Sequence, residues 1–290
     1  MFSLSKILVP VDFSERSTGA SRCAEALARR FGAEVILLHV LPPPHYEFSA
    51  LEVGGTVFNE LFAARARQVR KDLDEFAEGG LAGLNVRRVL LEGGPARKIV
   101  EFAHQEGVSA IIMPTHGYGV FRRFILGSTT AKVLHDADCP VWTGVHLEQT
   151  PEVEVIRFER VLAAIDLGPQ SQKTLEWAAG LASNYGARLH VVHALPCVAV
   201  GGEGAPAEFR ERLTGQARDR AGQLLASAGI RDAELSVQTG DPPMLVCDTA
   251  GRLQADVLVI GRGSAAGVFG RLRTNAYAII RQSPCPVVSV

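Results

Sequence analysis

The sequence predicts an α/β protein that consists of two copies of one doubly wound domain, each with a five-stranded parallel sheet. Short apolar runs of strand length alternate with longer segments of helical periodicity, which is typical of a parallel sheet covered by helices on both faces. The same order of runs and helices occurs twice in the 290 residues. The composition, 47% apolar and 21% charged, agrees with globular domains of this kind.

Four sequence matches between the two halves indicate the duplication. In chain order, the matching segments are ILVPVD at 7–12 and VLAAID at 161–166, GAEVILLHVLP at 32–42 and GARLHVVHALP at 186–196, EGGP at 92–95 and TGDP at 239–242, and CPV at 139–141 and 285–287. A constant order with small shifts is expected for two long copies and not for a solenoid of short repeats. We therefore expect domains at 1–146 and 159–290, joined by a polar linker at 147–158 that contains a proline.

Each copy is expected to begin with a buried strand and an amphipathic helix. The runs at 7–11 and 161–165 are almost wholly apolar, as in strands that are buried on both faces. In the helix that follows the first run, apolar residues recur on one face from Ala20 to Phe31, and Gly32 supplies the stop signal. The second copy repeats this helix and ends it at Gly186.

The rest of each copy continues the alternation. The expected strands are 35–40, 86–91, 110–113 and 141–145 in the first copy, and 189–194, 235–237, 257–260 and 287–290 in the second. The expected helices are 61–76 and 209–225, one that begins at each of Pro95 and Pro242, and one that begins near Ser128. Proline suits the first turn of a helix because the N–H that it lacks has no partner there.

The loop PTHGYGVFRRFILGST at 114–129 is the main candidate for a binding site. It follows the apolar run at 110–113, contains three glycines and leads into the helix that begins near Ser128. Such a loop presents backbone N–H groups and a positive helix end to an anion, which predicts a phosphate site. Doubly wound sheets bind ligands at the carboxyl ends of strands where the strand order reverses. If the order reverses between the first and fourth strands, Asp12 lies beside this loop.

The first copy resembles the universal stress protein family over nearly its whole length. The resemblance rests on Val9-Pro10-Val11-Asp12, on Leu38-His39-Val40, and on Gly117 followed by nine residues and Gly127-Ser128. It implies a Rossmann-like, adenine nucleotide alpha hydrolase-like fold, and the two copies resemble the tandem subclass. It also implies ATP, with or without Mg²⁺, at the carboxyl edge of the sheet. The implied adenosine contacts are Val11, Asp12, Val40 and Met113, and the implied phosphate contacts are Gly117, Gly127, Ser128 and Thr129.

Each of these residues also has a plain structural alternative. Asp12, Ser128 and Thr129 could simply cap helices, and the glycines could simply serve turns. The loop also departs from the family pattern, because Pro114 stands where the first glycine is expected. Proline offers no N–H and does not adopt a positive φ. Weaker binding is expected if the glycine used either property.

The second copy keeps less of the pattern. Its loop reads GRGSAAGVFGRLRTN at 261–275, with Ser264 in place of the middle glycine and Arg273 in place of the last one. The sequence therefore predicts a degenerate second site, whose residues are Asp166, Gly261 and Thr274.

Charge and cysteine content narrow the function classes. A formal net charge of −1 argues against nucleic-acid binding, and no apolar run approaches the length of a bilayer span, so no membrane contact is expected. The N-terminus shows no pattern of a secretion signal, which favours a cytoplasmic protein. Five cysteines without C-x-x-C spacing favour reduced thiols, and no metal site is predicted.

We expect regulation rather than catalysis, since no spacing indicates catalytic residues. A nucleotide-free protein-interaction module and a slow ATP hydrolase are the alternatives. The apolar closing strands at 141–145 and 287–290 would be exposed at sheet edges, where an apolar strand seeks a partner. By resemblance to the dimeric family, they are expected to pair with each other as an intramolecular pseudo-dimer, with a further homodimer as an open alternative.

Overall fold

A computed structural model describes residues 2–43, 55–115, 126–144, 156–196, 206–262 and 274–290. The first half contains β1 (Lys6–Pro10), α1 (Glu15–Phe31), β2 (Glu34–Leu41), α2 (Gly55–Glu75), β3 (Val86–Glu92), α3 (Pro95–Glu106), β4 (Ala110–Ile112), α4 (Ser128–Asp136) and β5 (Val141–Thr143). The second half contains β6 (Arg160–Ile165), α5 (Ser171–Tyr185), β7 (Arg188–Leu195), α6 (Ala207–Ser227), β8 (Ala233–Thr239), α7 (Pro242–Leu253), β9 (Val257–Ile260), α8 (Thr274–Gln282) and β10 (Val287–Ser289). The predicted α/β class and the repeated order of elements are confirmed.

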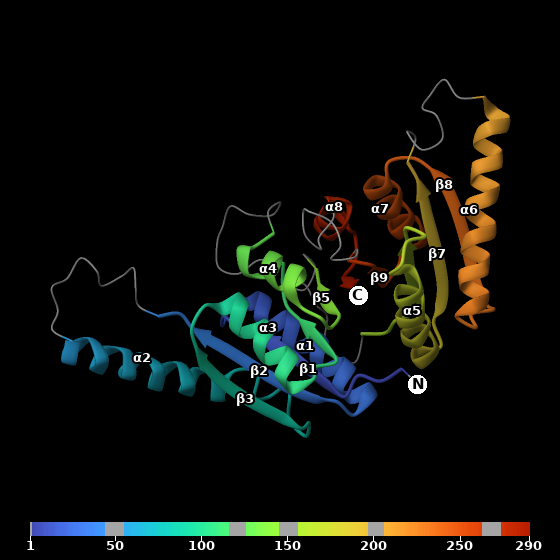
Figure 1. Cartoon of the computed structure of the whole chain (residues 1–290). Coiled ribbons are helices and arrows are strands. Elements are labelled where there is room, and N and C mark those ends of the chain that lie inside the picture. Colours follow the sequence, from blue (N-terminus) through green and yellow to red (C-terminus); the bar gives the residue numbers. More distant parts are fainter. Residues whose placement is uncertain (1, 44–54, 116–125, 145–155, 197–205, 263–273) are drawn as a thin grey trace.

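The described strands form one ten-stranded sheet with the order β3-β2-β1-β4-β5-β10-β9-β6-β7-β8 (Figure 1). Strand β1 lies between β2 and β4, and both pairings are parallel, so the strand order reverses between β1 and β4 as expected. Strand β6 lies in the same way between β7 and β9. The reversal brings the end of β1 and the end of β4 to the same edge of the sheet, where the site was predicted.

Helix ends follow the signals in the sequence. In α1, the N-cap Ser14 accepts a hydrogen bond from the N–H of Ser17, and Gly32 ends the helix with a φ of 66°. The prolines predicted at helix starts begin α3 and α7. Strand β8 is longer than the predicted 235–237, because it is an edge strand in which polar residues alternate with apolar ones. Continuous apolar runs are typical of strands buried on both faces, so the polar ends of this edge strand carry no such signal.

The two halves meet where β5 and β10 pair in the antiparallel direction. Val287 lies opposite Thr143, Val288 opposite Trp142, and Ser289 opposite Val141. Val290 follows β10, and its N–H bonds to the carbonyl oxygen of Ile260. The two closing strands therefore cover each other's edges among the described residues.

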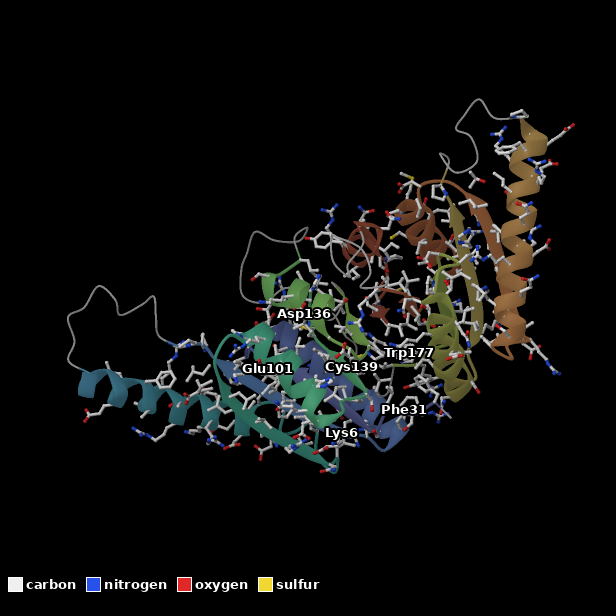
Figure 2. All side chains as sticks on the ribbon, in the orientation of Figure 1. Lys6, Phe31, Glu101, Asp136, Cys139 and Trp177 are labelled. Carbon is white, nitrogen blue, oxygen red and sulfur yellow. The ribbon has the colours of Figure 1, made fainter. Side chains whose placement is uncertain are left out.

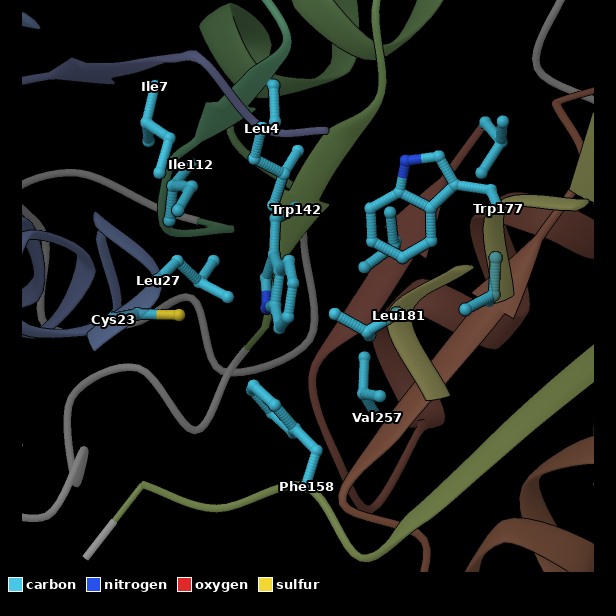
Figure 3. Packing of buried hydrophobic residues seen from close by; sticks show 14 of the residues in the cluster. Leu4, Ile7, Cys23, Leu27, Ile112, Trp142, Phe158, Trp177, Leu181 and Val257 are labelled. Atoms are coloured by element: carbon cyan, nitrogen blue, oxygen red, sulfur yellow. The ribbon is translucent and has the colours of Figure 1, made fainter. Parts of the chain in front are cut away.

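A hydrophobic core continues across this junction. On one face of the sheet, Trp142 is 1% exposed and packs against Phe158 and Trp177, with ring centroids 5.5 and 6.2 Å away (Figure 3). Trp177 belongs to α5 of the second half, so the tryptophan pair joins the halves. A second cluster on the other face also contains residues of both halves. The halves therefore share their apolar burial.

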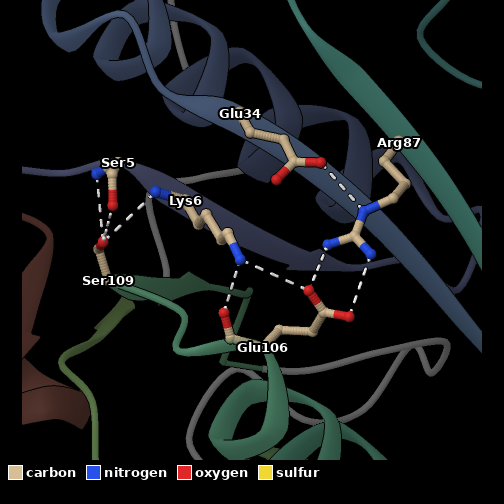
Figure 4. Close-up of polar contacts among 6 residues, drawn as sticks. All are labelled: Ser5, Lys6, Glu34, Arg87, Glu106 and Ser109. Carbon is tan, nitrogen blue, oxygen red and sulfur yellow. Dashed lines mark hydrogen bonds and ion pairs between the residues drawn. The ribbon is translucent and has the colours of Figure 1, made fainter.

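A polar network ties the amino ends of the first-half strands together, away from the predicted site. Arg87 donates to Glu34 at 3.0 Å and to both oxygens of Glu106, and Lys6 reaches the main-chain carbonyl of Glu106 (Figure 4). The hydrogen bond from Arg87 lowers the pKa of Glu106. We interpret this network as structural: it holds the amino ends of the strands and the end of α3 together.

We predict that Trp142→Ala lowers the free energy of unfolding by about 3 to 5 kcal/mol, because it leaves a cavity between two halves that share one core. Urea unfolding followed by far-UV circular dichroism measures the change. The control, Leu61→Ala, alters a side chain that is 48% exposed and should shift the free energy by less than about 0.5 kcal/mol. A Trp142→Ala effect as small as that of the control would contradict a shared core.

Candidate functional site

A cavity of about 310 Å³ lies at the carboxyl edge of the first-half strands. The residues that line it are Pro10, Val11, Asp12, Ser17, Leu38, His39, Val40, Pro95, Ile99, Met113, Pro114, Gly127, Ser128, Thr129 and Thr130. Seven of the eight residues predicted for the first site are among them. The eighth, Gly117, lies outside the described residues. The topology therefore brings together predicted residues that lie up to 118 positions apart in the sequence, from Val11 to Thr129.

One part of the cavity wall is apolar. Val11, Val40 and Met113 come from the ends of β1, β2 and β4, and each is at most 7% exposed. Ile99 of α3 adds a further apolar wall. A concave apolar surface with a few polar groups at its margin is the usual character of a small-molecule site.

Asp12 stands at the polar margin in a fixed orientation. Its Oδ1 accepts hydrogen bonds from the backbone N–H of Ser14 at 3.1 Å, from the Ser14 hydroxyl at 2.6 Å, and from the Ser17 hydroxyl. Ser14, and not Asp12, is the N-cap of α1, so the capping alternative for Asp12 is wrong in its simple form. No described residue donates to Oδ2, which leaves one carboxylate oxygen to accept a hydrogen bond from a ligand.

The residue after each aspartate has an unusual backbone conformation. Phe13 has a φ of 63° and Leu167, at the equivalent position of the second half, has a φ of 58°. A positive φ in a bulky residue costs on the order of 1 kcal/mol and persists only where the surroundings impose it. The sequence gives no signal for it, because neither position holds a glycine or an asparagine. In both halves it lies between the aspartate and the helix that the aspartate braces.

His39 holds the backbone on the other side of Asp12. Its Nδ1 lies 2.7 Å from the carbonyl oxygen of Val11, and its ring stacks on Phe13 with centroids 4.8 Å apart. His193 makes the same contact with the carbonyl of Ile165 at 2.8 Å. Burial lowers the pKa of His39 and favours the neutral ring, whose Nδ1–H then donates to Val11. The sequence paired these histidines through the duplication but did not indicate this role.

The start of α4 forms the polar end of the cavity. Gly127 is the N-cap of α4, so neither Ser128 nor Thr129 acts as an N-cap here. The N–H of Gly127 donates to the carbonyl of Thr115 at 2.8 Å, and its φ of −59° is open to any residue. The N–H groups left without a helical partner are those of the first turn, which begins at Ser128. This end of the cavity is suited to an anion.

The ends of the loop are tied together at Pro114. The hydroxyl of Thr130 donates to the carbonyl of Pro114 at 3.0 Å, and the Gly127–Thr115 bond lies beside it. Proline has the same main-chain carbonyl as the glycine that the family pattern places here. The hydrogen bond from Thr130 is therefore available with either residue.

A second cavity of about 290 Å³ occupies the equivalent place in the second half. It is lined by Asp166, His193, Gly261 and Asn275, among others. Oδ1 of Asp166 accepts from the N–H of Gly168 at 2.8 Å and from the hydroxyl of Ser171 at 3.1 Å. Of the predicted second site, Asp166 and Gly261 thus line one cavity. Thr274 begins α8, and its side chain lies outside the described residues.

Gly261, which follows β9, and Pro114, its counterpart near the end of β4, differ in the space that their neighbours leave for a side chain. A Cβ on Gly261 would lie 3.0 Å from the hydroxyl of Thr174 and 3.4 Å from the Cβ of Gln170. In the first half a repeat offset of 154 residues places Ala20 where the second half has Thr174, so the hydroxyl that crowds this position in the second half has no counterpart at residue 20.

Other chemistry has less support in the described part of the chain. No group of three His, Cys, Asp or Glu side chains gathers there closely enough to hold a metal ion. None of the helices it contains is both long and apolar enough to cross a membrane. The four described cysteines are free thiols, and burial raises the pKa of Cys23 to about 12 and that of Cys139, Cys247 and Cys285 to about 11. These thiols are protonated and weakly nucleophilic at neutral pH.

Comparison with known proteins gives a consistent family. Residues 4–143 and 157–290 each match the model of the universal stress protein family. Universal stress protein MJ0531 of Methanocaldococcus jannaschii is 32% identical over 136 residues, covering 47% of this chain and 79% of that protein. Universal stress protein MJ0577 of the same organism is 30% identical over 148 residues, covering 47% and 91%. A universal stress protein from Archaeoglobus fulgidus shares the fold, with a TM-score of 0.69 at 22% identity over 99% of this chain and 96% of that one.

We predict that the pH dependence of stability is partly due to His39. Because its folded pKa is lowered, the unfolded chain binds the proton more tightly. The free energy of unfolding therefore falls as the pH drops below the unfolded pKa of about 6.5. His39→Asn keeps a donor for the Val11 carbonyl without a titrating ring, so it should flatten the profile between pH 7 and 5. Urea unfolding at several pH values measures this, and equal slopes in both proteins would refute it.

Proposed function

The chain belongs to the universal stress protein family as a tandem two-domain stress-response protein, and we propose that it binds ATP or a related adenine nucleotide in its first cavity. The role is regulatory rather than catalytic. The observation that carries this proposal is the arrangement of the first cavity, which has buried apolar walls, a braced carboxylate and a helix N-terminus around one space.

Each part of an adenine nucleotide has a matching part of the cavity. The purine would lie against Val11, Val40 and Met113, whose burial gives an apolar wall. Oδ2 of Asp12 would accept from the ribose or the base. The phosphates would lie at the first turn of α4, at Ser128 and Thr129, where free N–H groups and the helix dipole favour negative charge. Gly117 is proposed at the same end from the family spacing. Mg²⁺, if present, would be held chiefly by phosphate oxygens and water.

Binding is proposed mainly for the first domain. The second cavity keeps the equivalents of Asp12 and His39, but its loop has lost the family's glycines at 264 and 273. We therefore assign Asp166, Gly261 and Thr274 to a weaker or empty site.

The polar groups of the first cavity are engaged in structural hydrogen bonds, which favours a regulatory role over nucleotide turnover. Oδ1 of Asp12 is engaged by Ser14 and Ser17, and Nδ1 of His39 is engaged by Val11. These contacts hold groups still, as binding requires. The Ser17 hydroxyl, which donates to Asp12, also accepts the N–H of Asp12, so its oxygen is engaged within the turn. Slow hydrolysis would appear as phosphate release.

The seam between the halves supports a further part of the proposal. The antiparallel pair of β5 and β10 has the character of a dimer interface within one chain, so we propose an intramolecular pseudo-dimer. A homodimer of the whole chain would need a different surface, because this edge is already paired. We propose a cytoplasmic location, as expected from the sequence.

Nucleotide binding predicts that millimolar Mg-ATP stabilises the folded protein. A ligand at 100 times its dissociation constant adds about 2.7 kcal/mol to the free energy of unfolding. Gly127→Asp should abolish this gain while the protein stays folded, because aspartate is a favoured N-cap but repels phosphate. Thermal denaturation with and without Mg-ATP measures both. Asn275→Asp, which places the same charge at the start of α8, is the matched control and should leave the first site intact.

A wild-type melting temperature that does not change with Mg-ATP would favour the nucleotide-free interaction module. A gain that survives Gly127→Asp would place the phosphates elsewhere. The same measurement on Asp12→Asn and on its second-half counterpart, Asp166→Asn, then shows which half binds the nucleotide, because only the variant in that half should lose the gain.

We also predict that Pro114→Gly changes nucleotide affinity by less than about threefold, which is less than one hydrogen bond contributes. The tie at this position uses the carbonyl, which both residues have. Thr130→Val removes the donor of that tie and should weaken binding by about 2- to 10-fold. Isothermal titration calorimetry compares the two variants. A much larger gain in affinity in Pro114→Gly would show that the family's glycine contributes through its N–H or its φ.

A further inference from the structure

The second half of the chain holds the carboxyl end of α4, the helix whose amino end faces the first cavity. The guanidinium of Arg262 donates to the main-chain carbonyl of Ala137 at 2.7 Å, to that of Leu134 at 3.4 Å, and to that of Cys139 at 2.7 Å. Arg262 is only 6% exposed. Figure 2 shows Asp136 and Cys139 at this end of α4, on the side of the first half that faces the second. A buried cation that donates to carbonyls at a helix C-terminus stabilises the helix dipole.

The second half also contacts the chain just before α4. The hydroxyl oxygen of Tyr277, on α8, accepts a hydrogen bond from the backbone N–H of Leu126 at 3.3 Å. Leu126 is 6% exposed and directly precedes Gly127, the N-cap of α4. Since α4 has only nine residues, contacts at both of its ends fix the direction of the N–H groups in its first turn.

The residue types behind these contacts differ between the halves. The repeat offsets of 147 and 146 residues place Thr115 where the second half has Arg262, and Ala131 where it has Tyr277. The half with the poorer phosphate loop thus supplies the arginine and the tyrosine, and the half with the better loop receives their contacts.

We propose that Arg262 and Tyr277 are positioning residues for the first site, through which the second half sets the nucleotide affinity of the first. The inference rests on the proposed function. Neither residue lines the first cavity, so each acts through the placement of α4. A helix end that is already fixed in place loses less conformational freedom when phosphate binds, and this raises affinity. The second half therefore contributes to binding without needing a ligand of its own.

The sharpest test is Tyr277→Phe, which keeps the ring and removes the oxygen that accepts from Leu126. We expect the amide of Leu126 and those of the first turn of α4 to exchange hydrogen faster, and Mg-ATP affinity to fall by about 2- to 10-fold. Tyr185→Phe is the matched control, because the Tyr185 hydroxyl is buried and has no hydrogen-bond partner among the described residues. It should leave both readouts unchanged.

A second variant tests the other end of α4. Arg262→Gln should weaken Mg-ATP binding by at least as much as Tyr277→Phe, and Arg262→Lys, which keeps the charge but not the fork of donors, should recover part of the loss. Arg29→Gln is the control. Arg29 also donates to main-chain carbonyls, those of Gly80 and Ala82, but from the last turn of α1, about 20 Å of helix away from Asp12.

The outcomes separate this inference from the proposed function. If the wild-type protein binds no adenine nucleotide, the proposed function fails, and hydrogen exchange in the ligand-free protein still decides whether Tyr277 and Arg262 hold residues 126–136. Unchanged exchange in both variants overturns the inference. So does unchanged affinity in a protein that binds Mg-ATP, or an equal effect of Tyr185→Phe.

Discussion

The pairing of β5 with β10 is the constraint on which the rest of the molecule depends. It consists of three residue pairs, yet it turns two five-stranded sheets into one and places Trp142 in a core that both halves share. It also fixes Arg262, whose N–H donates to the carbonyl of Val290, the residue that follows β10. A strand pair that covers two apolar edges is thus also what brings a second-half arginine to a first-half helix.

The duplicated parts of the two sites lie at β1 and β2 and at β6 and β7, which β4 and β9 separate from this seam. Each half has an aspartate that braces the start of a helix, a bulky residue with positive φ after it, and a histidine that holds the preceding carbonyl. Such a turn is internally supported, because the histidine contact and the serine contacts fix the residues on both sides of it. It needs nothing from the other half, and the two copies have kept it alike.

The sequence was sufficient for the parts of the fold that follow from local pattern. Apolar runs located the buried strands, prolines and glycines located helix ends, and the reversal of strand order placed Asp12 beside the start of α4. Other features were hidden for physical reasons. The length of β8 was missed because an edge strand alternates polar and apolar residues. The positive φ of Phe13 depends on surrounding contacts and not on residue type, and the reach of Arg262 depends on how two halves pack.

In a tandem chain, equivalent positions on the two sides of the junction can hold different residues, which is impossible in a symmetric homodimer. In a two-fold symmetric pair, a residue that caps the partner's helix also occupies the same position in its own loop. At this position the first half has Thr115, whose main chain accepts from Gly127 beside the cavity, and the second half has Arg262, whose side chain reaches across. Joining the copies allows the side chain at this position to differ between the halves, while every residue type still supplies the main-chain carbonyl. Divergence at Thr115/Arg262 and Ala131/Tyr277 is therefore compatible with the proposed division between a binding half and a supporting half.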